Sequence, residues 1–342
     1  MNSKNWDTIK KCCNMKNIEK APVGLIVDSP WIPGYVGIST IDYFTIPEKW
    51  FEANLKVIND FPDIIFFPGF WAEFGMATEP SGFGCKISFY EDTTPQVHNI
   101  LTSLDEFNKL SLPNPKTDGL MPFVLSIYKN MKSRIESVGH MLKIAVSRGP
   151  FTIASYVMGL SNFLTELKLN PQSTHKMLKL INDFIKIWLE AQLDVMKDAE
   201  GIMLLDDVIG FLSREDYLQF AHPYLKEIFK SYPRYIKIYH NDTDNPVPYE
   251  FLEELGVNIF NFTHMRSIAE VRSIIGNSVC LMGNVPPLQV LAQGSVDMVK
   301  EHALKCVKDN NGKGGLILSV GGGVSPGTPK ENLQALSNYY KY

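Results

Sequence analysis

The 342-residue sequence contains no run of about eighteen apolar residues, so we expect no helix that spans a membrane. Its opening segment, MNSKNWDTIKKCCNMKNIEK, holds no apolar stretch of the kind that a secretory signal carries. The 5 cysteines are an odd number and form no C-x-x-C pair, which indicates reduced thiols. Together these absences predict a cytoplasmic protein without a membrane partner.

The sequence also lacks an excess of basic residues. Lys and Arg number 33 against 37 for Asp and Glu, which gives a formal net charge of -4. A nucleic-acid-binding surface usually needs a strongly basic face, so we expect no nucleic-acid partner. The sequence shows no internal repeat, no low-complexity segment and no Rossmann or Walker signature.

Short apolar runs rich in Val, Ile, Leu and Phe recur along the chain. Runs that are apolar on both faces are typical of parallel strands covered by helices. The eight runs are 24–28, 63–69, 142–150, 201–208, 235–242, 258–264, 278–285 and 315–323. Most are separated by segments with helical periodicity, namely 47–60, 121–139, 171–199, 213–231, 247–256, 267–276, 295–309 and 329–340.

Alternation of strand and helix, repeated about eight times, predicts an α/β fold of the (β/α)8 TIM-barrel type. Such a barrel needs about 250 residues, and the surplus falls mostly in residues 70–120. That stretch is rich in Gly, Pro and Thr and is predicted to be an elaborated loop over the barrel mouth. No linker is evident, so residues 1–342 are interpreted as one domain. Thr328 to Glu331 reads as a capping box that starts the last helix.

Polar residues cluster at the carboxyl ends of the predicted strands. In a (β/α)8 barrel these ends converge on one mouth, where active sites are built. A single polar residue at a strand end can simply face solvent, but a set from six strands favours a shared site. The set comprises Asp28, Arg148, Asp206 with Asp207, His240 with Asp242, His264 and Asn284.

The strand ends and nearby loops are also unusually aromatic. Aromatic walls suit a flat ring, and ligand pockets are mostly apolar with a few placed polar groups. The alternative is that some of these rings only cover the barrel end as core. The residues expected to contact substrate include Trp31, Tyr35, Phe70, Trp71 and Tyr156.

A glycine run, Gly321-Gly322-Gly323, follows the last predicted strand. A loop and helix start at this position can bind an anion, such as a phosphate of a cofactor tail. The interpretation we favour is that the glycines permit tight backbone and let a large planar cofactor approach.

Several segments resemble the uroporphyrinogen decarboxylase superfamily, and within it the cobamide-dependent methyltransferases. The resemblance covers nearly the whole chain and implies a (β/α)8 barrel. The segments are KNIEKAPV, GFG-Cys85-K, GPFTIASYVMG, DDVIGFLSREDY, His240-Asn241-Asp242, GNVPP and the closing LSVGGGVSPGTPKENL. The closing segment is similar to the Ser-x-Gly-Cys…Pro-x-x-Thr-Pro-x-x-Asn pattern of those methyltransferases.

The chain departs from this resemblance at the metal ligands. Methyltransferases of the family that activate thiols hold zinc through a His-x-Cys pair and a later Cys. Here the pair reads His240-Asn241-Asp242 and the later position is Gly322, so the usual cysteine ligands are absent. A harder metal site with His240, Asp242 and either Asp207 or Glu73 stays open, zinc included. The alternative is an acid/base cluster without metal.

A decarboxylase acting on porphyrinogens is disfavoured by charge. Its substrate carries many carboxylates and needs arginines for bidentate contacts. The segment DSPWIPGYVG, which resembles the arginine-bearing segment of the decarboxylase, contains no Arg, and Pro68 replaces an expected Asp. Arg148 is the sole arginine at the end of a predicted strand.

The resemblance therefore implies a methyltransferase that moves a methyl group between a small molecule and the cobalt of a separate corrinoid protein. We favour O-demethylation of a methoxylated aromatic, with His240, Glu73, Asp207 and Asp242 as candidates to neutralise the departing oxygen. The corrinoid would be carried by the partner protein, and a homodimer is compatible with the resemblance. Two alternatives stay open: a decarboxylase or lyase of another substrate, and a non-catalytic corrinoid-binding protein.

Overall fold

Eight parallel strands form the main sheet of the computed structural model, which describes residues 1–16, 18–27 and 29–341. Seven strands lie within the predicted apolar runs and β1 begins one residue before its run, so all eight predicted strands are confirmed. The strands are β1 Val23–Ile26, β2 Ile64–Phe67, β5 Ile144–Arg148, β6 Gly201–Leu205, β7 Ile236–Asn241, β8 Ile259–Phe262, β9 Cys280–Val285 and β10 Leu316–Val320.

The sheet curls into a barrel because its first and last strands pair. The hydrogen-bonded order is β2-β1-β10-β9-β8-β7-β6-β5, with β1 parallel to β10. Within the described residues no ladder joins β2 to β5, so the barrel has one seam. At this seam, side chains form hydrogen bonds with the backbone N–H and C=O groups at the free edge of β5. Gln192 donates to Val146 O at 2.8 Å and accepts from Val146 N at 3.1 Å, while Glu79 accepts from Arg148 N at 2.9 Å.

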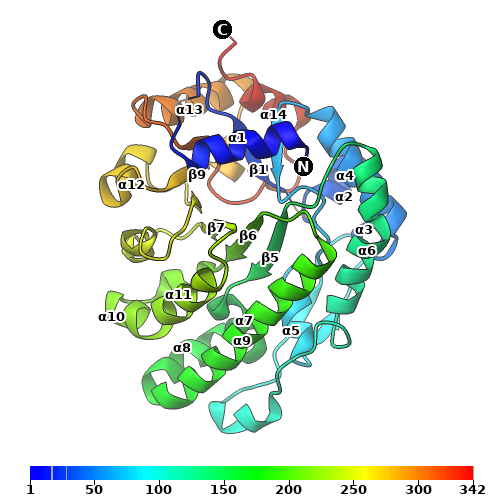
Figure 1. Ribbon diagram of the computed structural model, residues 1–342, viewed down its shortest axis with the longest axis vertical. Helices are drawn as coiled ribbons and strands as arrows, with labels where there is room; N and C mark the ends of the chain where they lie inside the picture. Colours follow the sequence, from blue (N-terminus) through cyan, green and yellow to red (C-terminus); the bar gives the residue numbers. More distant parts are fainter. Residues whose placement is uncertain (17, 28, 342) are drawn as a thin grey trace.

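Helices surround the strands (Figure 1) and bury one apolar face each. In α9 (Pro171–Val195) the buried face includes Met177, Ile181, Phe184 and Trp188, at helical spacing. The other covering helices are α4 Pro47–Asp60, α6 Met121–Ser137, α11 His222–Ser231, α12 Ile268–Ile275, α13 Val296–Asp309 and α14 Lys330–Ser337.

Three local predictions are corrected. The helix expected over 247–256 is only the 3-10 turn η4 (Val247–Phe251), because Gly256 at φ 71° ends the segment just before β8. The segment expected over 213–231 is α10 (Arg214–Asp216), a π-turn η3 (Tyr217–Ala221) and α11, since Pro223 cannot donate a helical hydrogen bond. Thr328 does not cap α14, because its hydroxyl donates to Ser325 O.

The N-terminal helix α1 (Ser3–Cys13) closes one end of the barrel. Its Trp6, Ile9 and Cys12 are buried against inward-facing side chains of the strands, such as Ile144 and Ile238. These inward residues form an apolar plug rather than a channel, as expected for a small barrel. The open end for chemistry is therefore the opposite one.

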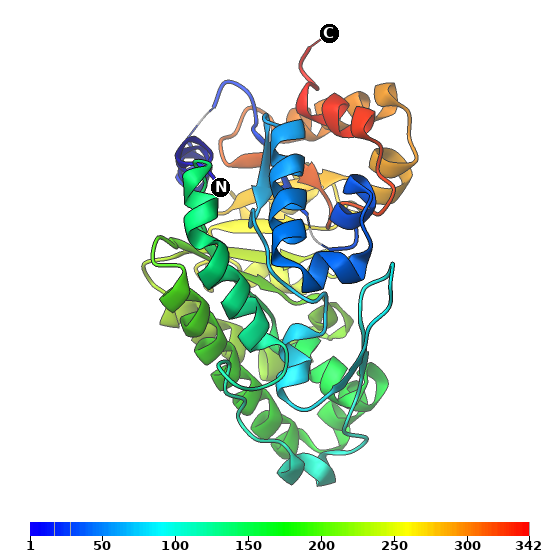
Figure 2. The same cartoon turned by 90° about the vertical axis from the view of Figure 1, so that its right-hand side faces the viewer.

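The predicted insertion at 70–120 lies at that opposite end. It contains α5 (Thr78–Gly82), the antiparallel pair β3 (Lys86–Ser88) and β4 (Gln96–His98), and the 3-10 helix η1 (Leu104–Lys109). In Figure 2 the hairpin, in cyan, and α1, in dark blue, lie on opposite sides of the sheet. The insertion over the mouth is thus confirmed.

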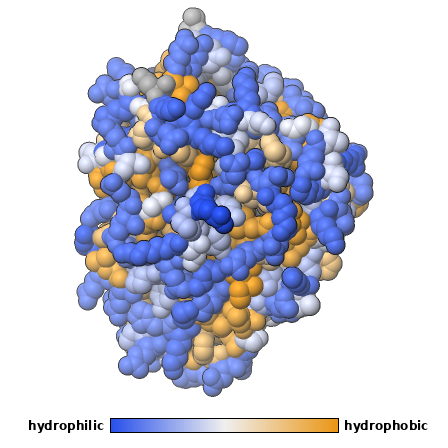
Figure 3. All heavy atoms as spheres, in the orientation of Figure 1, coloured by the Kyte–Doolittle hydropathy of each residue, from blue (hydrophilic) through white to orange (hydrophobic). Residues whose placement is uncertain are grey.

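The surface seen in Figure 3 is mostly hydrophilic, with smaller apolar areas between charged side chains. Within the described part of the chain, no helix is both long and apolar enough to cross a bilayer. Most large apolar side chains are buried in two cores, one inside the barrel and one between the strands and the helices.

Candidate active site at the barrel mouth

A polar layer lies directly above the apolar interior of the barrel. Because side chains alternate along a strand, the residues two positions beyond buried inward residues point the same way. Val146, Ile238 and Ile259 belong to the inner core. The next inward positions on β5, β7 and β8 are Arg148, His240 and Asn261, all of them buried. The mouth is thus built on charged and hydrogen-bonding groups.

Asn261 fixes the orientation of His240. The Asn261 side-chain nitrogen donates to Met282 O at 2.8 Å and to Val320 O at 3.1 Å. Its oxygen must therefore face His240, whose Nδ1 lies 2.6 Å away. An amide oxygen only accepts, so Nδ1 carries the proton. In a neutral ring this leaves a lone pair on Nε2, pointing toward Asp207.

We expect the neutral form of His240 to carry its proton on Nδ1 rather than on Nε2. Long-range 1H–15N NMR spectra of chelator-treated, 15N-histidine-labelled protein at pH 8 report the tautomer directly, and a His240→Gln variant assigns the signal. Asn261→Leu, which cannot accept a hydrogen bond, should shift His240 toward the Nε2–H form. Wild-type protein with its proton on Nε2 would contradict the hydrogen-bond assignment.

Asp207 and Asp242 complete a three-residue cluster with His240. One ligand atom from each residue lies within 4.8 Å of the others. His240 Nε2 is 3.5 Å from Asp207 Oδ1, which also accepts from Asp242 N at 3.0 Å. Loss of solvent raises the pKa of Asp242; the nearby Asp207 also raises this pKa, whereas His240 and His264 lower it. One imidazole nitrogen and two carboxylates fit a divalent cation of the harder kind.

The glycine run packs against this cluster. At Gly322, with φ 124°, an added Cβ would lie 2.9 Å from Asp242 Oδ2, and at Gly321 it would lie 2.3 Å from His264 N. The run therefore allows the close backbone approach that we expect, while the approach of a planar cofactor stays a prediction. Helix α14 starts only at Lys330, so no helix N-terminus directly follows Gly323 to hold an anion.

A second buried group lies across the mouth, around Arg148. Arg148 donates to Glu73 Oε2 at 2.8 Å, and the two side chains are 5% and 4% exposed. The other Glu73 oxygen accepts from Ser29 Oγ at 2.9 Å, and the Arg148 guanidinium lies 5.0 Å from the ring centre of Trp71. Removing one partner of such a buried pair costs about 3–5 kcal/mol. Glu73 therefore holds Arg148 in place and is less available as an acid.

A cavity of about 380 Å³ opens beside Arg148, under the hairpin. Its lining includes Arg148 and Tyr156, together with Met76 and Gln96 from the insertion. Burial raises the pKa of Tyr156, Arg148 lowers it and Asp207 raises it. Tyr156, in the wall of the cavity, thus lies within electrostatic reach of both Arg148 and Asp207.

The other predicted aromatic residues lie outside this cavity. Trp31 stacks on Tyr35 at 4.6 Å between ring centres, and Tyr35 donates to Asp60 on α4. Phe70 stacks on Phe51, also on α4, at 5.5 Å. Trp71 is buried inside the barrel core. Trp31, Phe70 and Trp71 are core residues, and Tyr35 is half-buried against the core. The expected aromatic wall of the cavity therefore reduces to Tyr156.

Two strand-end residues are used to hold loops. Asp206 accepts from Thr152 N, Thr152 Oγ1 and Phe151 N at 2.8 to 3.1 Å, at the start of α7 (Pro150–Met158). Burial raises its pKa to about 7, although these hydrogen bonds act in the opposite direction. Asn284 donates to Thr263 O and Arg266 O in the loop after β8. His264 lies near Asp242, and Asp28 falls outside the described residues.

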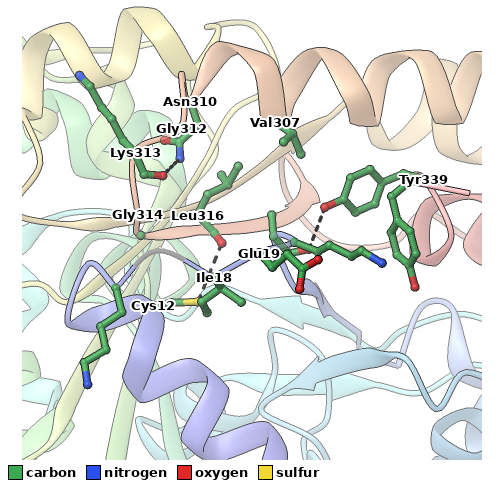
Figure 4. A pocket seen from close by; sticks show the side chains of 15 residues that line it. Cys12, Ile18, Glu19, Val307, Asn310, Gly312, Lys313, Gly314, Leu316 and Tyr339 are labelled. Carbon is green, nitrogen blue, oxygen red and sulfur yellow. Dashed lines mark hydrogen bonds between the residues drawn. The ribbon is translucent and has the colours of Figure 1, made fainter.

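A further cavity of about 310 Å³ lies at the opposite end of the barrel (Figure 4). Cys12, Lys313 and Tyr339 are among its lining residues, and Tyr339 donates to Ala21 O at 3.2 Å. It borders the start of β10 rather than its end. In (β/α)8 barrels that face serves stability, so we place the candidate site at the mouth.

The sequence reasoning missed Asn261, Ser29 and Glu79. The phase of β8 could have indicated Asn261, since it lies two residues after the apolar Ile259 and so faces inward with it. Ser29 and Glu79 follow no strand periodicity. Cys85, in the GFG-Cys85-K segment, is buried with its thiol 3.9 Å from Tyr156 O, and burial raises its pKa to about 12.

The fold and this placement of ionisable residues define a TIM-barrel protein of the kind that builds a site at the carboxyl ends of its strands. The model of the family described as uroporphyrinogen decarboxylase matches residues 7–341. The chain therefore belongs to the uroporphyrinogen decarboxylase family.

Curated relatives are distant from this chain. It is 25% identical over 260 residues to the uroporphyrinogen decarboxylase of Thermus thermophilus, covering 74% of this chain and 73% of the relative. It is 26% identical over 347 residues to that of Carboxydothermus hydrogenoformans, covering 96% and 94%. Identities of 25–26% are consistent with a shared family but do not show that the substrate is the same.

Two solved structures share the fold. A methyltransferase from Methanosarcina mazei superposes with a TM-score of 0.80 at 20% identity, covering 97% of this chain and 96% of that one. A B12-independent methionine synthase from a Shewanella species superposes with a TM-score of 0.57 at 10% identity, covering 93% and 96%. These similarities confirm the barrel expected from the strand count.

Proposed function

We propose that the protein is a corrinoid-dependent methyltransferase, which transfers a methyl group from a methoxylated compound to the cobalt of a partner corrinoid protein. The observation that carries the proposal is the oriented His240, with Asp207 and Asp242, at the mouth of the barrel. This cluster can neutralise charge on a departing oxygen. The Methanosarcina neighbour, a methyltransferase of the same fold, supports this choice.

The charges of the mouth argue against a porphyrinogen substrate. Asp207 and Asp242 are acidic, and Arg148 is already paired with the buried Glu73. A substrate with many carboxylates would meet repulsion and find no second guanidinium among the residues that line the described cavity. An uncharged methyl ether carries no such penalty.

In the reaction that we propose, every electron pair and proton is accounted for. The nucleophilic acceptor supplies an electron pair to the methyl carbon, and the carbon–oxygen bond breaks with its electrons left on oxygen. The oxygen then takes a proton. His240 can deliver it from Nε2, because Asn261 holds the ring and Asp207 Oδ1, 3.5 Å away, can pair with the imidazolium.

The donor is bound in the cavity beside Arg148. Tyr156 offers one aromatic face, while the other walls are mixed polar and apolar. The proposed donor is therefore a single methoxylated ring or a similar small ether rather than a large planar system. In this proposal the methyl acceptor, carried by a separate corrinoid protein, reaches the mouth from outside the barrel.

As an alternative to proton delivery, the cluster should bind a divalent cation with His240, Asp207 and Asp242 as ligands. Nε2 of His240 would then hold the metal and carry no proton. When bound, such a cation would act as a Lewis acid toward the leaving oxygen. We expect about one equivalent of Zn²⁺ or Co²⁺ by equilibrium dialysis and metal analysis, lost in Asp242→Ala but retained in Asp244→Ala. Absence of binding in wild type would leave proton transfer from His240 as the route.

The transfer is tested with the purified protein and cob(I)alamin under anaerobic conditions. A panel of methoxybenzenes, methylamines, methanol and methylated thiols is added, and the visible spectrum is followed. We expect methylcobalamin to form with the methoxylated compounds. The assay is repeated with added zinc, and in the reverse direction with methylcobalamin and methyl acceptors. If no methyl transfer is seen with any compound under any of these conditions, transfer to free cobalamin is contradicted.

The two alternatives give different outcomes. A decarboxylase would release carbon dioxide from its substrate without any cobalamin. A non-catalytic corrinoid-binding protein would bind cobalamin, yet alanine at His240, Asp207 and Asp242 would change no activity. Both outcomes would reject the proposed reaction.

A further inference from the structure

A third cavity, which is apolar and about 310 Å³ in volume, lies outside the barrel, beside the insertion. It is formed where helices α3 (Thr40–Thr45) and α6 approach the hairpin. The lining residues that matter here are Phe44, Phe74, Phe89, Leu120, Phe123 and Ile127. None of them belongs to the His240 cluster or to the mouth cavity.

Three phenylalanine rings form one continuous wall. Phe44 and Phe74 are buried, with ring centres 5.4 Å apart, and Phe74 meets Phe89 edge-on at 6.1 Å. Buried Ile127 contributes to the floor. The rim is formed by Phe89, which is 39% exposed, and Phe123, which is 58% exposed.

The cavity offers no charge. Thr45 and Ser126 are its polar side chains, and both already form hydrogen bonds. Thr45 Oγ1 donates to Ile41 O at 2.7 Å, and Ser126 Oγ accepts from Asn130 Nδ2 at 3.2 Å. An ionic ligand would lose its hydration here without compensation. The occupant must therefore be apolar.

We propose that this cavity binds a small uncharged aromatic molecule. A cavity of about 150 Å³ lined by apolar side chains is enough to hold benzene, so about 310 Å³ accommodates one substituted ring. Phe123 is 58% exposed, and a ligand ring would cover its face. The inference is independent of the methyl transfer.

The site is connected to the mouth through two short segments. Phe74 lies between Glu73, which holds Arg148, and Gly75, which lines the mouth cavity. Phe89 directly follows β3, and β4 returns along the mouth cavity with Gln96 and Val97. A ligand on Phe74 and Phe89 thus contacts the elements that cover the candidate active site.

The proposal is tested with fluorobenzene, an aromatic probe that has no methyl group to donate. Its 19F NMR signal is titrated against the full-length protein, and we expect saturable binding. Phe123→Ala should weaken binding about tenfold, because one aromatic wall is lost. Phe211→Ala removes a ring of similar exposure, 65%, that does not line the cavity and should leave the Kd unchanged.

Two further comparisons separate this site from others. Tyr156→Ala alters the mouth cavity and should leave the Phe123-dependent part of fluorobenzene binding intact, and 4-fluorobenzoate should not compete for that part. Lack of saturable binding, or equal weakening by Phe123→Ala and Phe211→Ala, would overturn the proposal. A wild-type dimer that Phe123→Ala converts to a monomer, without fluorobenzene binding, would show that a second copy covers the cavity and would also overturn it.

Discussion

Replacing His240 with alanine is expected to lower the rate of methyl transfer by about 10²–10⁴-fold while the protein stays folded. The residue supplies the oriented Nε2 of the cluster, with Asn261 on one side and Asp207 on the other. In the proposed reaction its substitution removes the group that neutralises the leaving oxygen. Turnover is measured as methylcobalamin formation, and folding by circular dichroism and urea unfolding.

The matched control for His240 is His302→Ala. His302 lies on α13, away from the mouth, and should keep full activity. His240→Gln keeps a polar side chain but supplies no imidazole for proton transfer, so it should behave like the alanine variant. Full activity of His240→Ala would remove His240 from the reaction.

Replacing Asp206 with alanine should lower the free energy of unfolding by about 3–5 kcal/mol, whereas Asp207→Ala should lower it by less than about 1 kcal/mol. Asp206 is fully buried and accepts three hydrogen bonds at the start of α7. Its loss leaves buried donors on Phe151 and Thr152 unpaired. Asp207 faces the mouth, and 35% of its side chain is exposed.

In the activity assay we expect the opposite ranking of the same two variants, with the larger specific loss in Asp207→Ala. Asp207→Ala should reduce methyl transfer strongly at full stability, because the carboxylate beside His240 is lost. Urea unfolding curves and initial rates, measured on both variants, separate the roles. Equal loss of stability in the two variants would show that the separate roles, structural for Asp206 and catalytic for Asp207, are wrongly assigned.

The strands of the barrel were predictable because their residues are apolar on both faces and their spacing is regular. The same regularity places His240 and Arg148 inward, in phase with Ile238 and Val146. Residues beyond the strand ends have no such phase. Trp31 and Phe70 follow β1 and β2, but the chain turns there and both rings pack toward α4.

The different roles of Asp206 and Asp207 could not be predicted from the sequence either. Both follow β6, and the direction of each side chain depends on where α7 begins. Gly149 leaves room for the Asp206 carboxyl, since an added Cβ there would lie 2.4 Å from it. A contact between residues so distant along the chain has no local signal.

The account is tested most directly by following the methyl group itself. Purified protein is incubated anaerobically with cob(I)alamin and methoxybenzene that carries a CD3 group, and the cobalamin and the ring product are analysed by mass spectrometry. The account predicts CD3-cobalamin and phenol in equal amounts, and neither product with His240→Ala. Unlabelled cobalamin beside intact ether would contradict it.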